Sequence, residues 1–523
     1  MSQTSKPQSE PAGNPNGTAK PGLIGRFLNT VERIGNLLPD PLVLFVLMMA
    51  AVPVASAIAS WSGWTRIHPV TGETVAAVNL LNAEGITRML TTAVGNFTSF
   101  PPLGIVLVAM LGIGLAERSG FLAAALRGFV AVVPKPLLTG ALVLGGVLSN
   151  LAVDAGYVVL VPMGAVLFAG VGRHPLAGMA AAFAGVSGGF SANLVITSLD
   201  PLLAGFTNAA AHLFDPGYHV EPTGNFYFML ASTALIVGAG WFVTERIVEP
   251  RLGKWTPPES FSDDPGSPVA PGATERRALA AAFAAAGIAA AIVILLFVPE
   301  GAMLRDEEGG LKPFYDALIP LLAVLFIIPG LVFGILTRTI RRAADISRML
   351  SETMAGMGGY LVLAFVASQF VAYFQWSNLG LLVALAGADV LRSSGAGPIP
   401  LLLGIIALSG TVNLFVGSAS AKWGLMAPVL VPMMMALGFS PELAQAAFRI
   451  GDSTTNIITP LLPYFPIILA FGQRYVPNLG LGTLVSIMLP YSVAFSIAWA
   501  VQLIVWFTLG WPLGPGAPLM LPQ

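Results

Sequence analysis

Cysteine is absent from this chain of 523 residues, and charged residues are scarce. Without cysteine the protein can form neither a disulfide nor a thiolate metal site. Charged residues make up 10% of the chain, compared with about 25% in typical soluble domains, and the mean hydropathy is +0.79. This composition argues against a large soluble enzyme. The net charge of −1 argues against nucleic acid as a partner.

Signatures of ATP use and of catalysis are also missing. No GxxxxGK[ST] pattern is present, which argues against an ATP-driven pump. An intramembrane hydrolase would need a Ser–His pair or an HExxH motif, yet no apolar segment contains a histidine except His174 at an edge. We therefore expect a protein that is not an enzyme, with no catalytic residues and no organic cofactor.

Long apolar runs dominate the chain instead. A helix that crosses a membrane needs about 20 apolar residues. We therefore predict an all-α polytopic membrane protein with about nine transmembrane helices. The predicted spans are 40–61, 101–117, 175–205, 224–244, 278–297, 314–337, 357–375, 441–469 and 482–510.

Two further segments, 137–171 and 399–436, are each long enough for two short helices and carry Gly, Ser and Asn at their middles. We predict that both are re-entrant helical hairpins, which enter and leave the membrane on one side. The spans 175–205 and 441–469 are interrupted in the same way, so we predict broken helices there. Non-helical backbone at membrane depth is tolerated only where it is buried in protein or lines water.

A polar segment rich in Pro and Gly, 250–276, divides the chain and is interpreted as a cytoplasmic linker. It separates a first membrane half, 23–249, from a second membrane half, 277–523. Each half contains one hairpin and one broken helix. The polar tail 1–22 is predicted to be disordered.

Asparagines inside the interrupted stretches recur at a constant offset. Asn150 and Asn413 are 263 residues apart, and so are Asn193 and Asn456. With the N-terminus inside, the first hairpin lies on the inner side and the second on the outer side, so the two halves are inverted repeats. Interrupted segments at matching places in inverted repeats indicate the binding site of a secondary transporter.

Basic residues support this orientation. Of the 25 Lys and Arg residues, 18 fall on the side of the N-terminus and 6, among them Lys422, fall on the opposite side, while Arg449 lies within a span. Positive charge is enriched in cytoplasmic loops. We therefore predict a multi-pass plasma-membrane protein with a cytoplasmic N-terminus and a periplasmic C-terminus.

Arg449 and Asp452 are ionisable residues within a predicted span, and such residues are functional candidates because they are costly there. Their spacing of three makes them neighbours on one helix face. At the offset of 263 the first half has Val186 and Gly189, so the shared fold does not require the pair. We predict that Arg449 binds an anionic substrate group and that Asp452 binds a cation or exchanges a proton. The alternative is an ion pair that only joins two helices.

Oxygen atoms near the breaks suit a hard cation such as sodium. The alternatives are that each asparagine caps a half-helix and that glycine serves only a backbone bend. No metal other than a bound sodium ion is expected. The predicted cation-binding residues are Asn150, Asp154, Asn193, Asn413, Gly417, Ser418, Asp452 and Asn456.

Three residues have two interpretations each. Asp200 precedes a proline, so it could serve function or cap a helix. Asp154 could bind a cation or act as a cap. Trp423 could stack on an aromatic substrate or anchor the chain at the membrane interface.

Long stretches of the chain match one family of transporters. They include GIGLAERSG (112–120), DAGYVVLVPMGAVLF (154–168), NLFVGSASAKW (413–423) and RIGDSTTNIITPLLPYFP (449–466). On these stretches the chain resembles the p-aminobenzoyl-glutamate transporter (AbgT) family. The resemblance extends from residue 31 onward and implies a bacterial inner-membrane homodimer with nine spans and two hairpins per subunit.

The resemblance also implies a function. Members of the family are secondary transporters of p-aminobenzoyl-glutamate or related aromatic carboxylates, driven by a sodium or proton gradient, and some are associated with export of sulfonamide antimetabolites. The alternative is a sodium-coupled dicarboxylate importer, whose substrate has no ring to stack on Trp423. The expected partners are a small-molecule substrate, membrane lipid and a second subunit. The family positions important for transport, which form the predicted substrate-binding set, correspond to Asp200, Ser420, Trp423, Arg449, Asp452 and Pro460.

Overall fold

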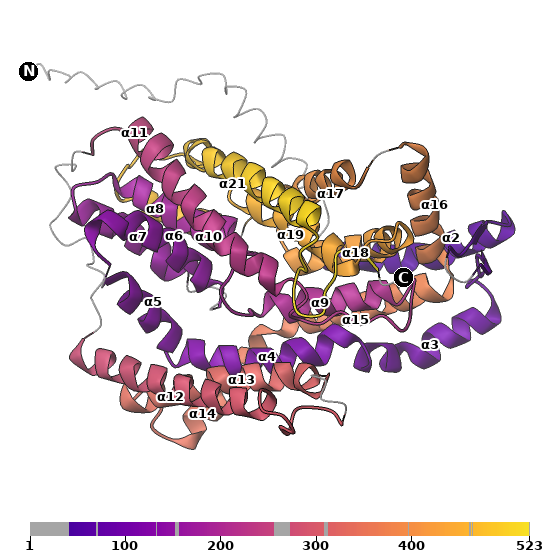
Figure 1. The fold of residues 1–523 in the computed structure, drawn as a ribbon, viewed down its shortest axis with the longest axis horizontal. Coiled ribbons are helices and arrows are strands. Elements are labelled where there is room, and N and C mark those ends of the chain that lie inside the picture. The colour runs from indigo at the N-terminus through magenta and orange to yellow at the C-terminus, as the bar shows by residue number, and fades with distance from the viewer. Residues whose placement is uncertain are drawn as a thin grey trace, which may run out of the picture.

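The computed structural model describes residues 41–69, 72–131, 133–151, 156–255, 272–307, 312–395, 397–459, 462 and 464–521. Helices dominate these residues (Figure 1). The strands β1 (Thr65–Ile67) and β2 (Thr74–Ala76) form a short antiparallel hairpin. The predicted tail 1–22 and most of the predicted linker 250–276 lie outside the described residues.

Residues 256–271, which lie outside the described residues, separate two sets of helices, and the helices Glu249–Leu252 and Ala273–Phe297 extend into the two ends of the predicted linker 250–276. Those before the linker are α2 (Pro41–Trp61), α3 (Ala83–Thr98), α4 (Pro101–Arg118), α5 (Phe121–Ala131), α6 (Leu138–Ser149), α7 (Val161–Gly170), α8 (Pro175–Phe183), α9 (Leu199–Ala211), α10 (Phe226–Val243) and α11 (Glu249–Leu252). Those after it are α12 (Ala273–Phe297), α13 (Lys312–Leu336), α14 (Ala343–Gly356), α15 (Gly358–Trp376), α16 (Leu379–Ser393), α17 (Pro398–Asn413), α18 (Ala419–Ala436), α19 (Pro441–Asn456), α20 (Phe465–Gln473) and α21 (Leu481–Leu509).

Among the described residues, seven helices are long and apolar enough to cross a membrane, or eight if the bent pair α4 and α5 counts as one span. Six of the seven are predicted spans, and the seventh is α18, the second arm of the predicted second hairpin. The predicted spans 175–205 and 441–469 are each divided into shorter helices, so neither contains a single helix long enough to cross a membrane. The prediction of a helical polytopic membrane protein is confirmed.

Each hairpin consists of two helices at the predicted place. Helices α6 and α7 form the first, and α17 and α18 form the second. The broken helices that follow begin alike, because a side chain caps each one and proline occupies its first position. Nδ1 of His174 accepts a hydrogen bond from the backbone N–H of Leu176 at 3.2 Å. Oγ of Ser440 accepts one from Leu443 at 3.3 Å.

The two halves repeat one close approach between hairpin and broken helix. A Cβ added to Gly185 would lie 2.2 Å from the carbonyl oxygen of Val143, and a Cβ added to Gly451 would lie 2.2 Å from that of Ile406. Only glycine permits these contacts. Val143 and Ile406 are 263 residues apart, but the two glycines are 266 apart.

The different offset shows that the first half holds three more residues between its glycine and its asparagine. A π-helical turn, η3 (Ala184–Gly188), lies at this point and accommodates part of the difference. At the offset of 266, the counterparts of Arg449 and Asp452 become Phe183 and Val186 instead of Val186 and Gly189. None of these residues is ionisable, so only the second half has charged residues at these positions.

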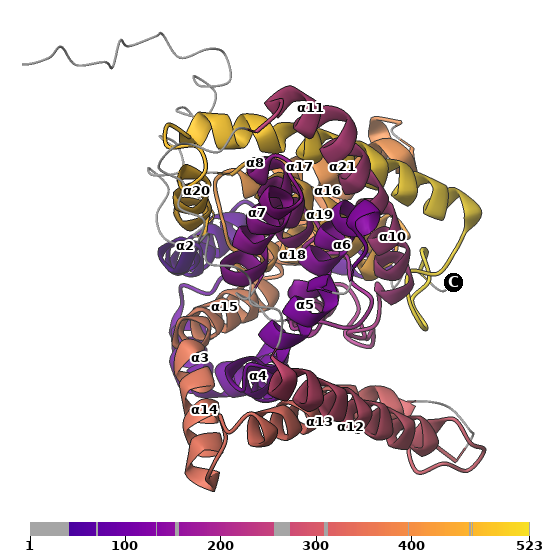
Figure 2. The same cartoon turned by 90° about the vertical axis from the view of Figure 1, so that its left-hand side faces the viewer.

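Helices α4, α12, α13 and α14 pack together along one edge, and α5 connects this layer to the hairpins (Figures 1 and 2). Helices α10 and α21 pack side by side over the opposite face. The centre is occupied by α8 and α19, which are almost completely buried. This arrangement places the charged helix α19 in the protein interior.

Connections assigned to the same side of the membrane contact one another. On the predicted inner side, Arg173 pairs with Glu249, and Nη2 of Arg251 donates to Oγ of Ser486 at 2.8 Å. On the predicted outer side, the backbone N–H of Phe228 donates to the carbonyl of Leu513, and that of Ser440 donates to Leu519. The last described residues thus lie beside the α18–α19 connection.

Candidate functional site

The helix α19 carries the charged residues of the site. Arg449 is 4% exposed and Asp452 is 1% exposed. Neighbours on several sides, among them α9, α17, α18 and α21, cover the helix. Because charge in a low-dielectric interior is costly unless it is paired, the partners of these two residues define what the site can do.

Arg449 pairs with Asp200, the second residue of α9. Nη1 of Arg449 lies 2.7 Å from Oδ1 of Asp200, and both side chains are buried. Oδ2 of Asp200 accepts hydrogen bonds from the backbone N–H and the hydroxyl of Thr197, at 2.7 and 2.9 Å. Nε of Arg449 is buried without an acceptor among the described residues. The guanidinium therefore keeps one donor that a ligand could use.

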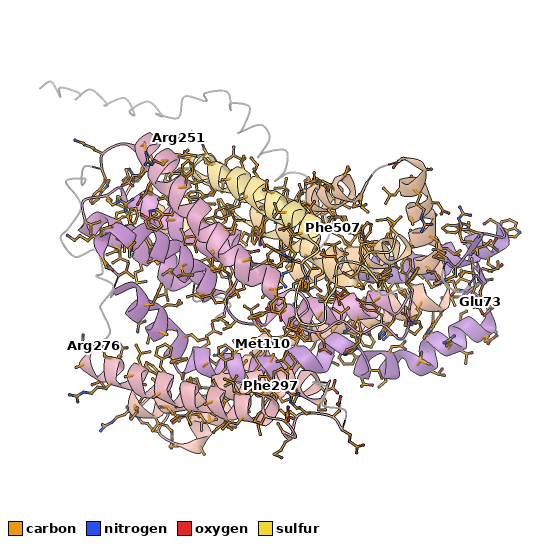
Figure 3. The ribbon with its side chains drawn as sticks, in the orientation of Figure 1. Glu73, Met110, Arg251, Arg276, Phe297 and Phe507 are labelled. Carbon is orange, nitrogen blue, oxygen red and sulfur yellow. The ribbon has the colours of Figure 1, made fainter. Side chains whose placement is uncertain are left out.

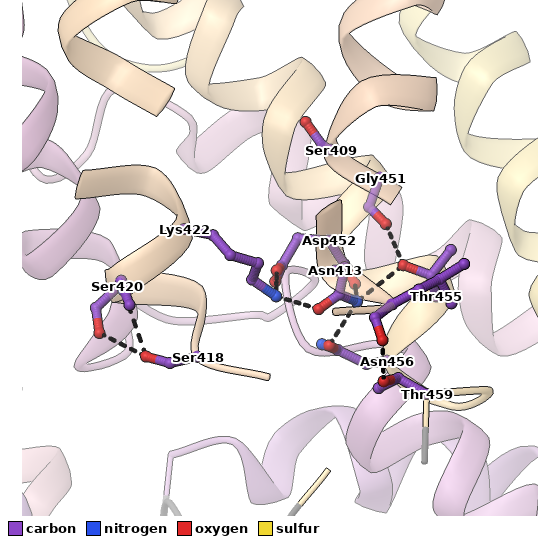
Figure 4. A network of polar contacts seen from close by, with 12 residues as sticks. Ser409, Asn413, Ser418, Ser420, Lys422, Gly451, Asp452, Thr455, Asn456 and Thr459 are labelled. Carbon is purple, nitrogen blue, oxygen red and sulfur yellow. Dashed lines mark hydrogen bonds and ion pairs between the residues drawn. The ribbon is translucent and has the colours of Figure 1, made fainter. Parts of the chain in front are cut away.

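Asp452 pairs with a different residue, Lys422 of α18 (Figure 4). Nζ of Lys422 contacts Oδ1 of Asp452 and also Oδ1 of Asn413, and the lysine side chain is completely buried. The prediction that Lys422 belongs to the outer side is wrong, because its side chain lies in the protein interior. The position of Lys422 inside an apolar run could have indicated this, because ionisable residues at membrane depth are functional candidates.

Arg449 and Asp452 therefore do not pair with each other, although three residues separate them. Arg449 contacts α9, and Asp452 contacts α18. The two ion pairs join α19 to the broken helix of the first half and to the hairpin of the second half. This arrangement connects the parts that an alternating-access cycle would move.

Asn413 at the tip of the second hairpin binds the broken helix directly (Figure 4). Its Nδ2 donates to Oδ1 of Asn456 at 2.8 Å and to the carbonyl oxygen of Asp452 at 2.6 Å. The tip of the second hairpin therefore lies against the broken helix at Asn456. The amide oxygen of Asn413 already contacts the ammonium of Lys422, so a sodium ion bound there would have to displace that group.

The corresponding asparagines of the first half meet through the backbone. Nδ2 of Asn150 and Nδ2 of Asn193 each donate to the carbonyl oxygen of Val147, at 3.1 Å. The amide oxygen of Asn193 accepts from the backbone N–H of Leu194 at 2.8 Å. Asp154, the acid predicted to bind a cation beside this tip, lies outside the described residues.

Trp423 lies in the protein interior. Its indole N–H donates to Oγ1 of Thr207 at 2.8 Å, and its ring packs against Phe448 at 4.6 Å between centroids. Thr207 donates to Gln445, which in turn donates to Asn225. The side chain is 0% exposed, so stacking on a substrate would require the second hairpin to move. The interpretation as an interfacial anchor is wrong.

A cavity of about 270 Å³ lies at the start of α9 and the start of α18 and is lined from both halves. Ser420 at the start of α18 and Asn150 at the first hairpin tip both face it. Thr197, which holds Asp200, is also in its wall. Ligand sites commonly measure about 300–1,000 Å³. Two aromatic residues, Phe190 and Tyr360, line the same cavity.

The remaining predicted residues lie at the second hairpin. Oγ of Ser418 accepts from the backbone N–H of Ala421 at 3.3 Å and lies 3.2 Å from Oγ of Ser420. Ser418 therefore caps α18, and Gly417 precedes it in the turn between the hairpin helices. Pro460, predicted to be important for transport, lies outside the described residues.

Comparison with known proteins shows which family the sequence matches. Residues 26–521 match the model of the "AbgT putative transporter family". The chain is 39% identical to the p-aminobenzoyl-glutamate transport protein of Escherichia coli (strain K12) over 495 residues, which are 94% of this chain and 96% of that protein.

Two solved structures have the same fold. The YdaH transporter of Alcanivorax borkumensis, described as having an unusual topology, superposes with a TM-score of 0.86 and 44% identity, covering 91% of this chain and all of that one. Neisseria gonorrhoeae MtrF, described as illuminating a class of antimetabolite efflux pumps, gives a TM-score of 0.89 and 43% identity. It covers 94% of this chain and 100% of that one.

Proposed function

The chain belongs to the AbgT family of transporters, and on this premise we propose that it is a secondary active transporter of p-aminobenzoyl-glutamate or a related aromatic carboxylate. The observation that carries the proposal is the position of Arg449. Its guanidinium is buried, has an Nε–H without an acceptor among the described residues and is held by Asp200, whose hydrogen-bond partner Thr197 lines a cavity formed by both halves. A buried guanidinium with a free donor suits a carboxylate ligand.

The cavity supports an aromatic substrate in a different way from the one predicted. Trp423 is buried, so it does not distinguish an aromatic substrate from a plain dicarboxylate in this conformation. Phe190 and Tyr360 offer ring surfaces instead. We propose that the aminobenzoyl ring packs on these residues while a carboxylate approaches Arg449. Export of sulfonamide antimetabolites is a second proposed activity, and the description of MtrF supports it.

We further propose that the halves 23–249 and 277–523 move relative to each other during transport. The coupling ion would be a proton or sodium. Asp452 is the candidate acid for a proton. The cavity-lining oxygens of Asn150 and Ser420 are candidates for sodium, together with the other oxygens of the second hairpin. Displacement of Lys422 would be required for sodium to reach Asn413.

We also propose that the protein forms a homodimer in the bacterial inner membrane, with its N-terminus in the cytoplasm. Because Lys422 is buried, it leaves the outer set of basic residues, and the excess on the inner side increases. A reporter that is active only in the periplasm should be active when it is fused after Gln523. A well-expressed but inactive fusion would contradict this orientation.

The test of function is flux of radiolabelled p-aminobenzoyl-glutamate in proteoliposomes, with sodium and pH gradients imposed separately. Succinate serves as the competitor without a ring. We expect gradient-driven flux that succinate does not inhibit. Flux of succinate alone would favour the dicarboxylate importer.

Arg449→Ala is the matched variant for this experiment. Stripping the partner from a buried charge costs roughly 2–5 kcal/mol, so we expect substrate binding to be lost. Asp200 is then also unpaired, so the folded state of the variant is checked first by thermal unfolding. Normal binding and flux in a folded Arg449→Ala variant would refute the role of Arg449.

A further inference from the structure

A second cavity, of about 430 Å³, lies between α5, α12, α13 and the tip of the first hairpin. Every residue that lines it is apolar. Phe121, Phe129, Phe283 and Phe326 provide its aromatic walls. No polar side chain in this wall could hold water or the carboxylate substrate proposed above, because buried water needs polar partners.

The cavity is open at the surface of the protein. Phe283 lines it and is 56% exposed, and Val195 lines it and is 44% exposed. The wall helices α12 and α13 are both long and apolar enough to span the membrane. The outer face of α12 exposes Ile288, Ile292 and Leu295. Hydrocarbon is therefore the medium that reaches the cavity.

Basic residues lie beyond one end of the cavity. Arg127 lies between two lining residues of α5, Leu126 and Phe129, and pairs with Glu275 of α12 at 3.2 Å. Arg276 and Arg277 are exposed at the start of α12, and Arg276 lies at the free end of that helix (Figure 3). Seven residues, or about 10 Å along a helix, separate Arg276 from Phe283. Basic groups between membrane helices bind anionic lipid headgroups.

We propose that this cavity binds one acyl chain of an anionic phospholipid whose headgroup lies at Arg276 and Arg277. The chain occupies the apolar space, and the headgroup phosphate lies at the end of α12. The proposal rests on the shape, lining and charge of this region and is independent of the transported substrate.

The site has a consequence for the transporter, because its inner wall is shared with the cavity of about 270 Å³ described above. Leu148 and Leu151 at the first hairpin tip line the cavity of about 430 Å³, whereas Asn150 lines the cavity of about 270 Å³. In the same way, Val195 lines the larger cavity and Thr197 lines the smaller one. The hairpin tip and the helix break thus form a partition, and a bound acyl chain would stabilise this position of the tip.

Native mass spectrometry of the purified full chain tests the proposal, with phosphatidylglycerol and phosphatidylcholine of identical chains as probes. Ala286→Trp fills the cavity, and Ala284→Trp on the exposed face of α12 is the matched control. We expect Ala286→Trp to weaken phosphatidylglycerol binding by about tenfold or more, since the loss of two buried methylene groups suffices for that change. Ala284→Trp should bind as the unmodified chain does.

The double variant Arg276→Gln/Arg277→Gln tests the headgroup separately and leaves the cavity intact. We expect it to lose the preference for phosphatidylglycerol over phosphatidylcholine. Equal binding of both lipids by the unmodified chain would overturn the headgroup assignment. Unchanged binding by Ala286→Trp, or displacement of the lipid by p-aminobenzoyl-glutamate, would overturn the acyl-chain site.

Discussion

The first and second hairpins pack on their broken helices through the same glycine contact, but their tips differ. In the first half, the amides of Asn150 and Asn193 share the carbonyl oxygen of Val147. In the second half, Asn413 contacts the ammonium of Lys422, which also pairs with Asp452. The contact between a glycine and a backbone carbonyl is thus the same in both halves. Among the described residues, only the tip of the second hairpin contacts charged side chains. We infer that the charged contacts of the second half are central to transport.

The largest effect should come from leaving one charge of the second tip unpaired. Asp452→Leu leaves the ammonium of Lys422 buried without its carboxylate, which typically costs about 3–5 kcal/mol of stability. The double variant Lys422→Met/Asp452→Leu removes both charges and should recover most of that loss. Thermal unfolding of the purified proteins in one detergent measures both effects. Equal stability of the single and double variants would contradict the pairing.

The ion pair between Arg449 and Asp200 joins the two halves. Weakening this pair should have the next largest effect, which we expect on substrate binding. Asp200→Asn replaces a charged acceptor with a neutral one, and hydrogen bonds to charged groups contribute about 1.5–3 kcal/mol. We expect weaker binding of p-aminobenzoyl-glutamate in calorimetric titration. Thr197→Val, which removes only one donor to Asp200, should have a smaller effect. The reverse order would show that Thr197 contacts the substrate itself.

The shared glycine contact should respond alike in both halves. Gly185→Ala and Gly451→Ala each force a Cβ against a backbone carbonyl, and overpacking of this kind costs about 1–3 kcal/mol. Gly404→Ala in α17 is the control, since nothing lies within 4 Å of its added Cβ. Melting temperatures of the three variants give the comparison. A strong effect at only one of the two contact glycines would break the equivalence of the halves.

The smallest expected effect concerns the caps of the two broken helices. Burial lowers the pKa of His174 below its ordinary value of 6.5, while Glu249 opposes this shift. The neutral ring is therefore the folded form, so its stabilisation is present above pH 6.5 and declines as the pH falls below that value. The hydroxyl of Ser440, which caps α19, does not titrate in this range.

Hydrogen exchange, corrected for the intrinsic pH dependence, measures this difference in peptides that cover the starts of α8 and α19. Protection at α8 should fall by up to about 1 kcal/mol in acid, the typical contribution of a cap. His174→Asn should abolish the pH dependence at α8. An identical response at both helices would contradict the assignment to His174.

Much of the architecture was predictable because hydrophobic length and inverted symmetry leave clear patterns in the sequence. The spans, the two hairpins and the broken helices lie close to their predicted residues. The approach of Asn413 to Asn456 was also predictable, since a hairpin tip must satisfy its polar groups within the protein. Local patterns of length and composition were sufficient for these features.

The pairing of charges was not predictable in the same way. Arg449 and Asp452 are neighbours on α19, so sequence spacing suggested one pair, but each points to a different packed helix. The burial of Trp423 likewise depends on contacts with Thr207 and Phe448, which are distant or unmarked in the sequence. Such choices are made by tertiary packing, which a single sequence does not specify.

The role of the charged pair formed by Lys422 and Asp452 is decided by gradient-driven flux of p-aminobenzoyl-glutamate through Lys422→Met/Asp452→Leu, reconstituted beside the unmodified protein. We expect the double variant to be folded, with a melting temperature close to that of the unmodified chain, yet to have no gradient-driven flux. Flux equal to that of the unmodified chain would show that this pair is only structural and has no part in transport.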